Sequence, residues 1–266
     1  MSMRSANPTL KASTFEQYRG YESSTTMTLG GTVNKTFMLL LFLAATASFS
    51  WNLTGDWREA VAAAEGGASS AAAAEGVVDP FTLMFGGVGL GLIFLLATVF
   101  KPNWSPVTAP LYALSEGVML GAISALAELQ FPGIAFQATC MTFCTLFGLL
   151  VAYKSGLIRA TENFKLGLFA AMSGIIMIYI VTWIVSLCGG SMPFIHSSGM
   201  VGIGFSAVVV VIAALNLVLD FDFIEHGVEI GAPKYMEWYG AFGLMVTLIW
   251  LYIEILHLLM KLNRRS

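Results

Sequence analysis

The sequence predicts an all-α, polytopic membrane protein with seven transmembrane helices. The first observation is composition: 57% of the 266 residues are hydrophobic and only 11% are charged, whereas a soluble domain carries roughly 25% charged residues. The second is a mean hydropathy of +0.77. The third is the recurrence of apolar runs of about 20 residues, the length that an α-helix needs to cross a bilayer. A soluble core could not bury this much apolar sequence, so we expect the chain to lie in a lipid bilayer.

Seven apolar segments define the predicted membrane domain, residues 34–262. The predicted spans are about 34–51, 80–100, 107–127, 133–153, 166–188 and 200–221, with a seventh that ends near Met260. The second span contains Gly87 and Gly91, and the third contains Gly117 and Gly121. This is the GxxxG spacing at which membrane helices approach closely. We therefore expect these two spans to pack tightly against neighbouring helices.

The segments outside the spans are polar. Residues 1–33 lack the apolar core and cleavage site of a secretory signal, so we interpret them as a cytoplasmic tail. Residues 52–79 contain the run REAVAAAEGGASSAAAAEG and are predicted to form a low-complexity external loop. Residues 263–266 are interpreted as a short C-terminal tail.

The distribution of basic residues favours a cytoplasmic N-terminus. Lys and Arg occur in the N-terminal tail, at Lys101, in residues 154–165 and at Lys234, while the intervening loops contain only Arg58. Seven spans satisfy the positive-inside rule for these segments. They would nevertheless leave three basic residues outside, namely Lys261, Arg264 and Arg265. Either the C-terminus is external despite its charge, or one segment does not cross completely.

Three acidic residues lie inside apolar spans. Asp220 closes a run of Val, Ile, Ala and Leu, Glu254 has apolar neighbours on both sides, and Glu116 lies in the third span. A carboxylate at mid-helix costs roughly 2.5–3.5 kcal/mol on insertion, so such residues face a partner or water and mark functional sites. We take Asp220 and Glu254 as the candidate centre. The alternative is structural: an interfacial helix end for Asp220, and a hydrogen-bonding group for Glu254.

Neighbouring polar residues are secondary candidates. Asn216 precedes Asp220 by one turn on the same face and is suited to orient it, and His257 follows Glu254 by three residues and is suited to relay protons. An interfacial position is the alternative for His257. Asp222 lies on a different face from Asp220, where a solvated cytoplasmic position is the alternative.

The sequence offers no sign of catalysis. The motifs GxxxxGK[ST], HExxH and CxxC are absent, and no nucleophile and base show a supporting spacing. The formal net charge of −3 is small. We therefore expect no enzyme activity, no bound cofactor and no nucleic-acid partner.

Several segments resemble the Bax inhibitor family, the transmembrane Bax inhibitor motif proteins. PLYALSEG, LNLVLDFDFIEHG and WLYIEIL carry the family pattern. NPTLKASTFEQY near the start and GAPKYMEWYGAFGLMVTLIWLYIEIL near the end resemble its bacterial branch. The resemblance covers nearly the whole chain. It implies a seven-helix fold with the last helix central, a location in the inner (plasma) membrane of the cell, and a pH-sensitive Ca²⁺ leak.

The resemblance also implies site residues. A pair of carboxylates on the sixth and seventh helices acts as pH sensor and gate in the family. Asp220, in LDFDFI, matches the sixth-helix acid, and Glu254, in LYIEI, matches the seventh-helix position, where Asp is usual. Lys101 stands where a basic residue can latch onto the sixth-helix acid, although Lys lacks the bidentate fork of Arg. Glu116 matches an acidic third-helix position found in part of the family.

The chemistry of two acids supports this interpretation. Carboxylates close together in a low dielectric cannot both ionise cheaply, so such a pair titrates as a unit. Protonated, the pair is hydrogen-bonded and closed, and ionised, it admits water or binds a cation. Ca²⁺ takes 6–8 oxygen ligands, so Asp220 and Glu254 would form only a weak, transient Ca²⁺ site, as a leak requires. The alternative is a non-conducting membrane regulator that binds a membrane protease or a stress-pathway partner through its N-terminal tail.

Whether the two acids meet depends on where the last helix enters the membrane. A helix that begins to cross at Tyr235 carries Glu254 about 28 Å further along, near the side opposite to Asp220. The acids then meet only if residues 235–242 precede the membrane, or if the sixth helix extends well beyond it.

Overall fold

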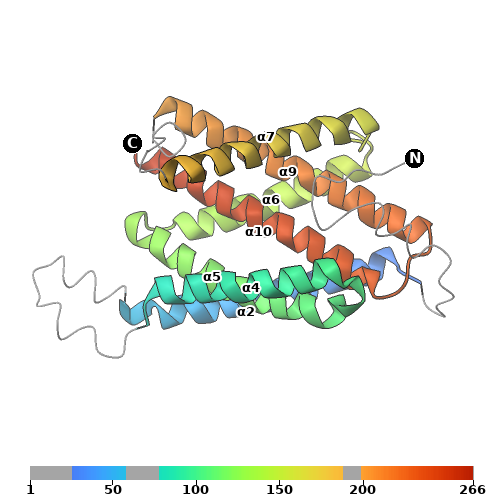
Figure 1. The fold of residues 1–266 in the computed structure, drawn as a ribbon, viewed down its shortest axis with the longest axis horizontal. Coiled ribbons are helices and arrows are strands. Elements are labelled where there is room, and N and C mark those ends of the chain that lie inside the picture. Colours follow the sequence, from blue (N-terminus) through green and yellow to red (C-terminus); the bar gives the residue numbers. More distant parts are fainter. Residues whose placement is uncertain (1–25, 58–77, 188–198, 266) are drawn as a thin grey trace, which may run out of the picture. The chain divides into compact units, whose positions relative to one another are not determined.

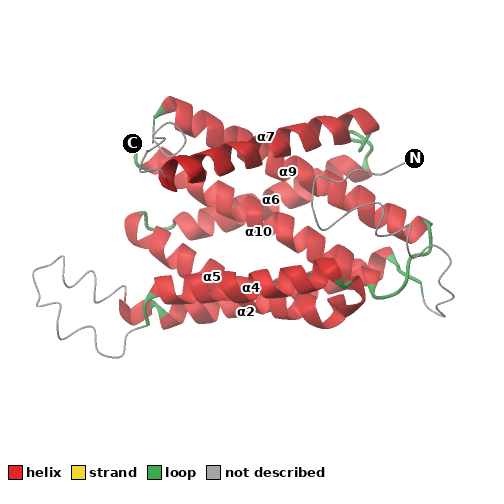
Figure 2. Cartoon of the chain, viewed as in Figure 1, coloured by secondary structure: helices red, strands yellow, loops and turns green. Residues whose placement is uncertain are grey.

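The computed structural model describes residues 26–57, 78–187 and 199–265, and nearly all of them are helical (Figure 2). Seven helices in these residues are long and apolar enough to cross a membrane. They are α2 (Leu29–Leu53), α4 (Pro80–Phe100), α5 (Ser105–Gln130), α6 (Ile134–Lys154), α7 (Glu162–Leu187), α9 (Met200–Glu229) and α10 (Met236–Asn263). A short 3-10 helix, η1 (Pro102–Trp104), joins α4 to α5. The protein is an all-α, multi-pass membrane protein, as predicted.

The observed helices follow the predicted spans in number and order. The second span has the predicted bounds, and its start is explained locally: Asp79 Oδ2 accepts a hydrogen bond from Thr82 N at 3.2 Å, and Pro80 occupies the first helical position. The sixth helix is longer than predicted, because α9 continues past Phe221 to Glu229. This extension keeps a buried face, which sustains the helix beyond the first charged residues.

The first helix begins inside the predicted N-terminal tail, at Leu29. Just before it, Met27 N donates a hydrogen bond to Ala232 O at 2.7 Å, and Thr26 forms an isolated antiparallel bridge with Pro233. The rest of the predicted tail, up to residue 25, and residues 58–77 of the predicted external loop lie outside the described residues.

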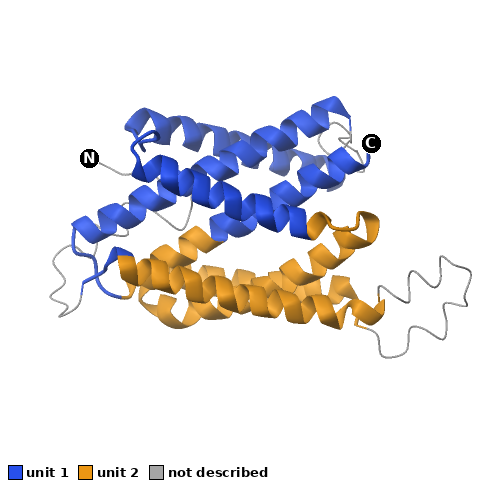
Figure 3. Ribbon diagram, turned by 180° about the vertical axis from the view of Figure 1, so that it is seen from behind, with its two compact units in different colours: residues 1–29, 136–234, 246–266 blue, residues 30–135, 235–245 orange. Residues whose placement is uncertain are grey.

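The chain divides into two compact units (Figure 3). Unit 1 comprises residues 1–29, 136–234 and 246–266, and thus most of α6, all of α7 and α9, and the C-terminal part of α10. Unit 2 comprises residues 30–135 and 235–245, and thus α2, α4, α5 and the start of α10. The last helix therefore contributes residues to both units.

In unit 2, α4 packs against α5 through its two glycines. A Cβ at Gly87 would lie 2.8 Å from the carbonyl oxygen of Ser115 and 2.9 Å from Met119 Cβ, distances that real side chains do not adopt. A Cβ at Gly91 would overlap the carboxylate of Glu116. The predicted role of this GxxxG pair in close helix packing is confirmed.

The GxxxG pair of α5 packs against α2. A Cβ at Gly117 would overlap the carbonyl oxygen of Leu43, and a Cβ at Gly121 would overlap that of Ala47. At the same place Ser50 Oγ donates a 2.8 Å hydrogen bond to a backbone carbonyl of α5. The backbones of α2 and α5 are therefore close enough for a serine side chain of one helix to reach the main chain of the other. The two glycines permit this approach because they have no Cβ.

In unit 1, two contacts define the register of α7 against α9. Lys165 Nζ lies 2.8 Å from Asp222 Oδ2. Further along α7, the ring of Tyr179 meets that of Phe205 edge-on, with centroids 6.4 Å apart. Residue numbers rise on α7 while they fall on α9, so the two helices are antiparallel (Figure 1).

Candidate functional site among the buried carboxylates

Glu254 lies inside α10 and is 7% exposed. Its Oε1 accepts a hydrogen bond from Trp250 Nε1, one turn earlier on α10, at 3.2 Å. It accepts a second from the hydroxyl of Tyr179 on α7 at 3.4 Å. The indole N–H can only donate, so the carboxylate acts as the acceptor. This acid has polar partners from two helices, which offset its cost in an apolar span.

Lys261 lies two turns after Glu254 on the same face of α10, because seven residues return a helix almost to its starting angle. Its Nζ donates to Ser206 Oγ at 2.7 Å and to the carbonyl of Gly202 at 3.2 Å, both on α9. Its ammonium is near enough to Glu254 for an electrostatic interaction. Three helices, α7, α9 and α10, meet at a set of residues that we call the seam: Tyr179, Phe205, Ser206, Glu254 and Lys261.

Asp220 is fully buried. It lies on a buried stripe of α9 that also contains Ser206 and Asn216, at the three- and four-residue spacing of one helix face. Asn216, the residue predicted to orient Asp220, is 2% exposed, and its Nδ2 donates to the carbonyl of Ile212 at 2.8 Å. This amide hydrogen bond is made to the backbone of its own helix.

The antiparallel register places Asp220 and Glu254 at different levels. Lys261 lies beside Ser206. Seven residues back along α10 lead to Glu254, whereas seven residues forward along α9 lead only to Ala213. Asp220 is a further seven residues on, which is about 10 Å at 1.5 Å per residue. Counted along ideal helices from the Lys261–Ser206 contact, the two acids are thus offset by about two turns. Their pairing as sensor and gate stays a prediction.

His257, a predicted proton relay, is exposed. The buried positions around it on α10 are Glu254, Ile255 and Leu256. Its part in a proton relay from Glu254 stays a prediction.

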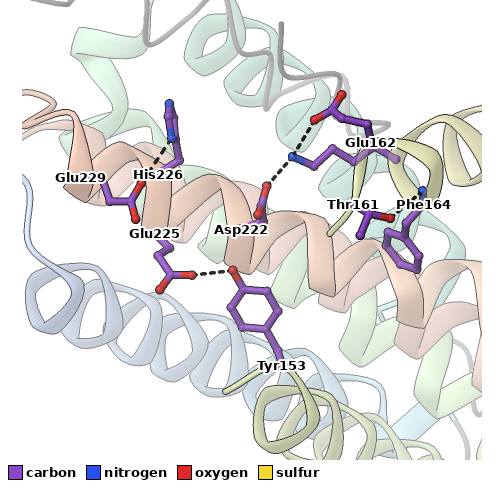
Figure 4. Close-up of polar contacts among 9 residues, drawn as sticks. Tyr153, Thr161, Glu162, Phe164, Asp222, Glu225, His226 and Glu229 are labelled. Carbon is purple, nitrogen blue, oxygen red and sulfur yellow. Dashed lines mark hydrogen bonds and ion pairs between the residues drawn. The ribbon is translucent and has the colours of Figure 1, made fainter. Parts of the chain in front are cut away.

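A second polar cluster in unit 1 surrounds the C-terminal part of α9 (Figure 4). Lys165 lies between two carboxylates, with Nζ 2.8 Å from Asp222 Oδ2 and 3.7 Å from Glu162 Oε1. Lys165 is 7% exposed. Asp222 thus compensates a buried ammonium and ties α9 to α7, a role that differs from the solvated position considered above. The sequence did not indicate this pair, because Lys165 lies just before the predicted fifth span, in a polar segment.

The rest of this cluster is more exposed. Glu225 and Glu229 are both exposed. Glu225 nevertheless accepts a 2.6 Å hydrogen bond from the hydroxyl of Tyr153, which links α9 to α6. His226 Nδ1 lies 3.6 Å from Glu229 within one helical turn (Figure 4). Three helices of unit 1 are therefore joined at this end by polar contacts.

Lys165→Met should destabilise the protein by about 2 kcal/mol, the usual value of a hydrogen bond to a charged group. The variant removes the ammonium that bridges α7 and α9, while Asp222, with 28% of its side chain exposed, can still be partly hydrated. Thermal unfolding in detergent micelles measures the effect. Lys154→Met, which removes an exposed lysine of the same unit, is the control, and equal melting temperatures of the two variants would contradict the prediction.

Lys101 and Glu116 both belong to unit 2. Lys101 is exposed, and its Nζ lies 4.7 Å from the ring centroid of Trp104, a cation–π geometry. Glu116 is 8% exposed and is hydrogen-bonded to Tyr112, one turn earlier on α5. Its carboxylate occupies the space that Gly91 leaves on α4. The latch role of Lys101 and the pathway role of Glu116 stay predictions.

A further acid, Glu237, lies at the start of the last helix. It is fully buried, with Oε2 2.5 Å from Lys35 Nζ on α2. The same ammonium lies 5.6 Å from the ring centroid of Trp238. Gly31 makes room for the pair, because a Cβ there would overlap the Glu237 carboxylate. The partners are 202 residues apart, so no local pattern could reveal them.

A sequence model of Bax inhibitor 1 like proteins matches residues 7–264, which include every helix described above. The chain belongs to the Bax inhibitor 1 like family. A search of curated proteins and a search of solved structures found no match. The resemblance inferred from the sequence segments is confirmed for this Bax inhibitor 1 like protein, together with its multi-pass membrane architecture.

In the described part of this Bax inhibitor 1 like protein, no group of three or more His, Cys, Asp or Glu side chains is arranged to hold a metal ion. A site made of two carboxylates is smaller than these groups, so the weak Ca²⁺ site at Asp220 and Glu254 stays a prediction.

Proposed function

We propose that this Bax inhibitor 1 like protein is a Ca²⁺ leak whose conduction depends on the protonation of Glu254 and Asp220. The Glu254 carboxylate carries the proposal, because it lies inside a membrane helix and accepts hydrogen bonds from Trp250 and Tyr179. Acids in this position are costly and are typical of ion and proton pathways. The fully buried Asp220 gives the same α9–α10 contact a second acid.

Protonation would control the charge that a cation meets. Protonated Glu254 is a neutral group held between Tyr179 and Trp250, and it attracts no cation. Ionised Glu254 is an oxygen ligand. Because Ca²⁺ takes 6–8 oxygen ligands, water must supply most of them at a single carboxylate, and binding stays weak. Weak binding suits a leak, because a tightly held ion does not leave.

Asp220 would provide the second step of the path. It follows Glu254 by about 10 Å along the helices, at the level of Thr247, which lies one heptad before Glu254 on α10 and is 3% exposed. Two weak sites in series allow an ion to enter one as it leaves the other. The proposed sensor is thus two acids in sequence that each bind a proton or a cation.

We place the protein in the inner (plasma) membrane of the cell, as the family resemblance implies, with a cytoplasmic N-terminus on the positive-inside rule. Seven crossings then put the end of α10 on the external side. The contacts of Lys261 with Gly202 and Ser206 support this orientation, because they account for one basic residue at that end by its packing against α9.

Ca²⁺ flux into dye-loaded proteoliposomes tests the proposal. Wild-type flux should rise between pH 6 and pH 8, because ionised carboxylates are cation ligands. Glu254→Gln keeps the shape of the side chain but cannot ionise. Its flux at pH 8 should be about tenfold lower, the factor that corresponds to about 1.4 kcal/mol, and should no longer depend strongly on pH.

Two outcomes would contradict parts of this proposal. Flux of Asp220→Asn equal to that of the wild type at every pH would remove Asp220 from the sensor. No flux at any pH, in wild-type protein that elutes as a single folded species, would exclude the leak. It would favour the membrane regulator, for which loss of protease capture on deletion of residues 1–25, which leaves α2 intact, is the expected result.

A further inference from the structure

We propose that Lys261 is a tethered plug that limits cation access to Glu254 from the C-terminal end of α10. This inference rests on the ion leak proposed above and names a residue that restricts it. Lys261 stands two turns beyond Glu254 on the same helix face, about 10 Å nearer the end of α10. A cation that approaches Glu254 along the seam from that end meets the ammonium first.

The ammonium reaches from α10 to α9 across the seam. On α9 it is anchored by Ser206 Oγ at 2.7 Å and by the carbonyl of Gly202 at 3.2 Å. Both residues are buried, with Ser206 3% exposed. Their small size leaves room for the four-carbon stem of the lysine. A lysine that only snorkels would direct its charge to the membrane surface, whereas Lys261 donates into a buried part of α9.

The anchors on α9 are neutral, which suits a plug that must move. Lys35 and Lys165 are held by the carboxylates of Glu237 and Asp222. On α9, Lys261 donates to a hydroxyl and a backbone carbonyl, which are weaker partners than a carboxylate. Its flexible stem can swing away from α9 when these bonds break.

The position of the charge decides its effect on ions. Glu254 interacts electrostatically with Lys261, which lies between Glu254 and the C-terminal end of α10 on the same helix face. A fixed positive charge in a low dielectric repels cations, and divalent ions most strongly. Lys261 therefore keeps the leak small while leaving Glu254 able to exchange its proton.

Proteoliposome flux tests the plug directly. Lys261→Met keeps the length of the side chain but removes its charge, and it should raise Ca²⁺ flux about fivefold at both pH 6 and pH 8. Ser206→Ala keeps the charge and removes one anchor, and it should raise flux by a smaller factor. Arg265→Gln removes an exposed charge at the same helix end and should leave flux unchanged. Flux of Lys261→Met no higher than wild type, or equal increases in Lys261→Met and Arg265→Gln, would overturn the proposal.

A chemical measurement separates the plug from the leak. A water-soluble carbodiimide with glycine ethyl ester converts accessible carboxyl groups to amides, and mass spectrometry of the Glu254 peptide gives the rate. Lys261→Met should be modified about five times faster than the wild type, and Glu254→Gln provides the blank. If Glu254 is modified faster in Lys261→Met but neither this variant nor the wild type conducts Ca²⁺, the plug is supported and the leak is rejected. Equal rates in folded protein would reject the plug, and Lys261→Gln replaces the methionine variant if that fails to fold.

Discussion

Lys35→Met should destabilise the protein by about 3–5 kcal/mol, the usual cost of removing one partner from a buried ion pair. Glu237 is fully buried, and its carboxylate contacts Lys35 Nζ at 2.5 Å. Methionine keeps most of the volume of the lysine stem but supplies no charge. The variant would leave the Glu237 carboxylate uncompensated in a low dielectric, beside the backbone of Gly31. A fall in melting temperature in detergent micelles measures this loss.

A double variant distinguishes loss of the ion pair from loss of packing. Lys35→Met combined with Glu237→Gln removes both charges while keeping both side chains near their original size, so it should recover most of the lost stability. Lys101→Met, which removes an exposed lysine of the same unit, should have little effect. If the double variant were less stable than Lys35→Met alone, an uncompensated charge could not be the cause.

Gly121→Leu should prevent α2 from packing against α5, with a loss of at least about 3 kcal/mol, the upper range for an overpacked site. A Cβ at this position would overlap the carbonyl oxygen of Ala47 and approach the Ser50 Cβ to 2.8 Å. The first of these atoms belongs to the backbone, so relief requires a shift of the whole helix. The shift would also break the hydrogen bond from Ser50 Oγ to α5. The yield of monodisperse protein after extraction, and its melting temperature, measure the effect.

Gly89→Leu is the matched control for this substitution. Gly89 lies in the other GxxxG-containing helix, α4, and a Cβ there would meet no atom within 4 Å in the described structure. Both variants replace a glycine inside a helix by leucine, so the effect of the substitution on the backbone is the same in both. Any difference in stability between them therefore reports packing. Equal yields and melting temperatures of the two variants would show that the close approach of α2 and α5 contributes little.

The number, order and approximate bounds of the helices could be predicted from the sequence. Apolar runs long enough to span a bilayer are a local property, and the cost of exposing backbone polar groups to lipid makes each run a helix. The close packing at the GxxxG pairs could also be predicted, because glycine, the residue without a Cβ, is recognised directly in the sequence. The extension of α9 to Glu229 was missed, because its charged residues occupy one face while a buried face continues.

The ion pairs could not be predicted. Lys35 and Glu237 are 202 residues apart, and Lys165 meets Asp222 through the antiparallel contact of two helices. Which helices meet, and in which register, depends on how side chains interlock over a whole interface. A polar residue near a helix end looks interfacial until its partner is known, as Glu237 shows.

By itself the sequence determined the membrane architecture, the family, and the presence of acids in apolar spans at Glu116, Asp220 and Glu254. The cost of inserting a side chain into the membrane depends on the residue type and its position in the span, so the sequence is enough to locate such acids. Only the tertiary structure decided what each acid contacts. The hydroxyl of Tyr179 donates a hydrogen bond to Glu254, and Lys261 Nζ donates one to Ser206 Oγ. These contacts could not be predicted, because helices pack through particular side chains and not through hydropathy alone.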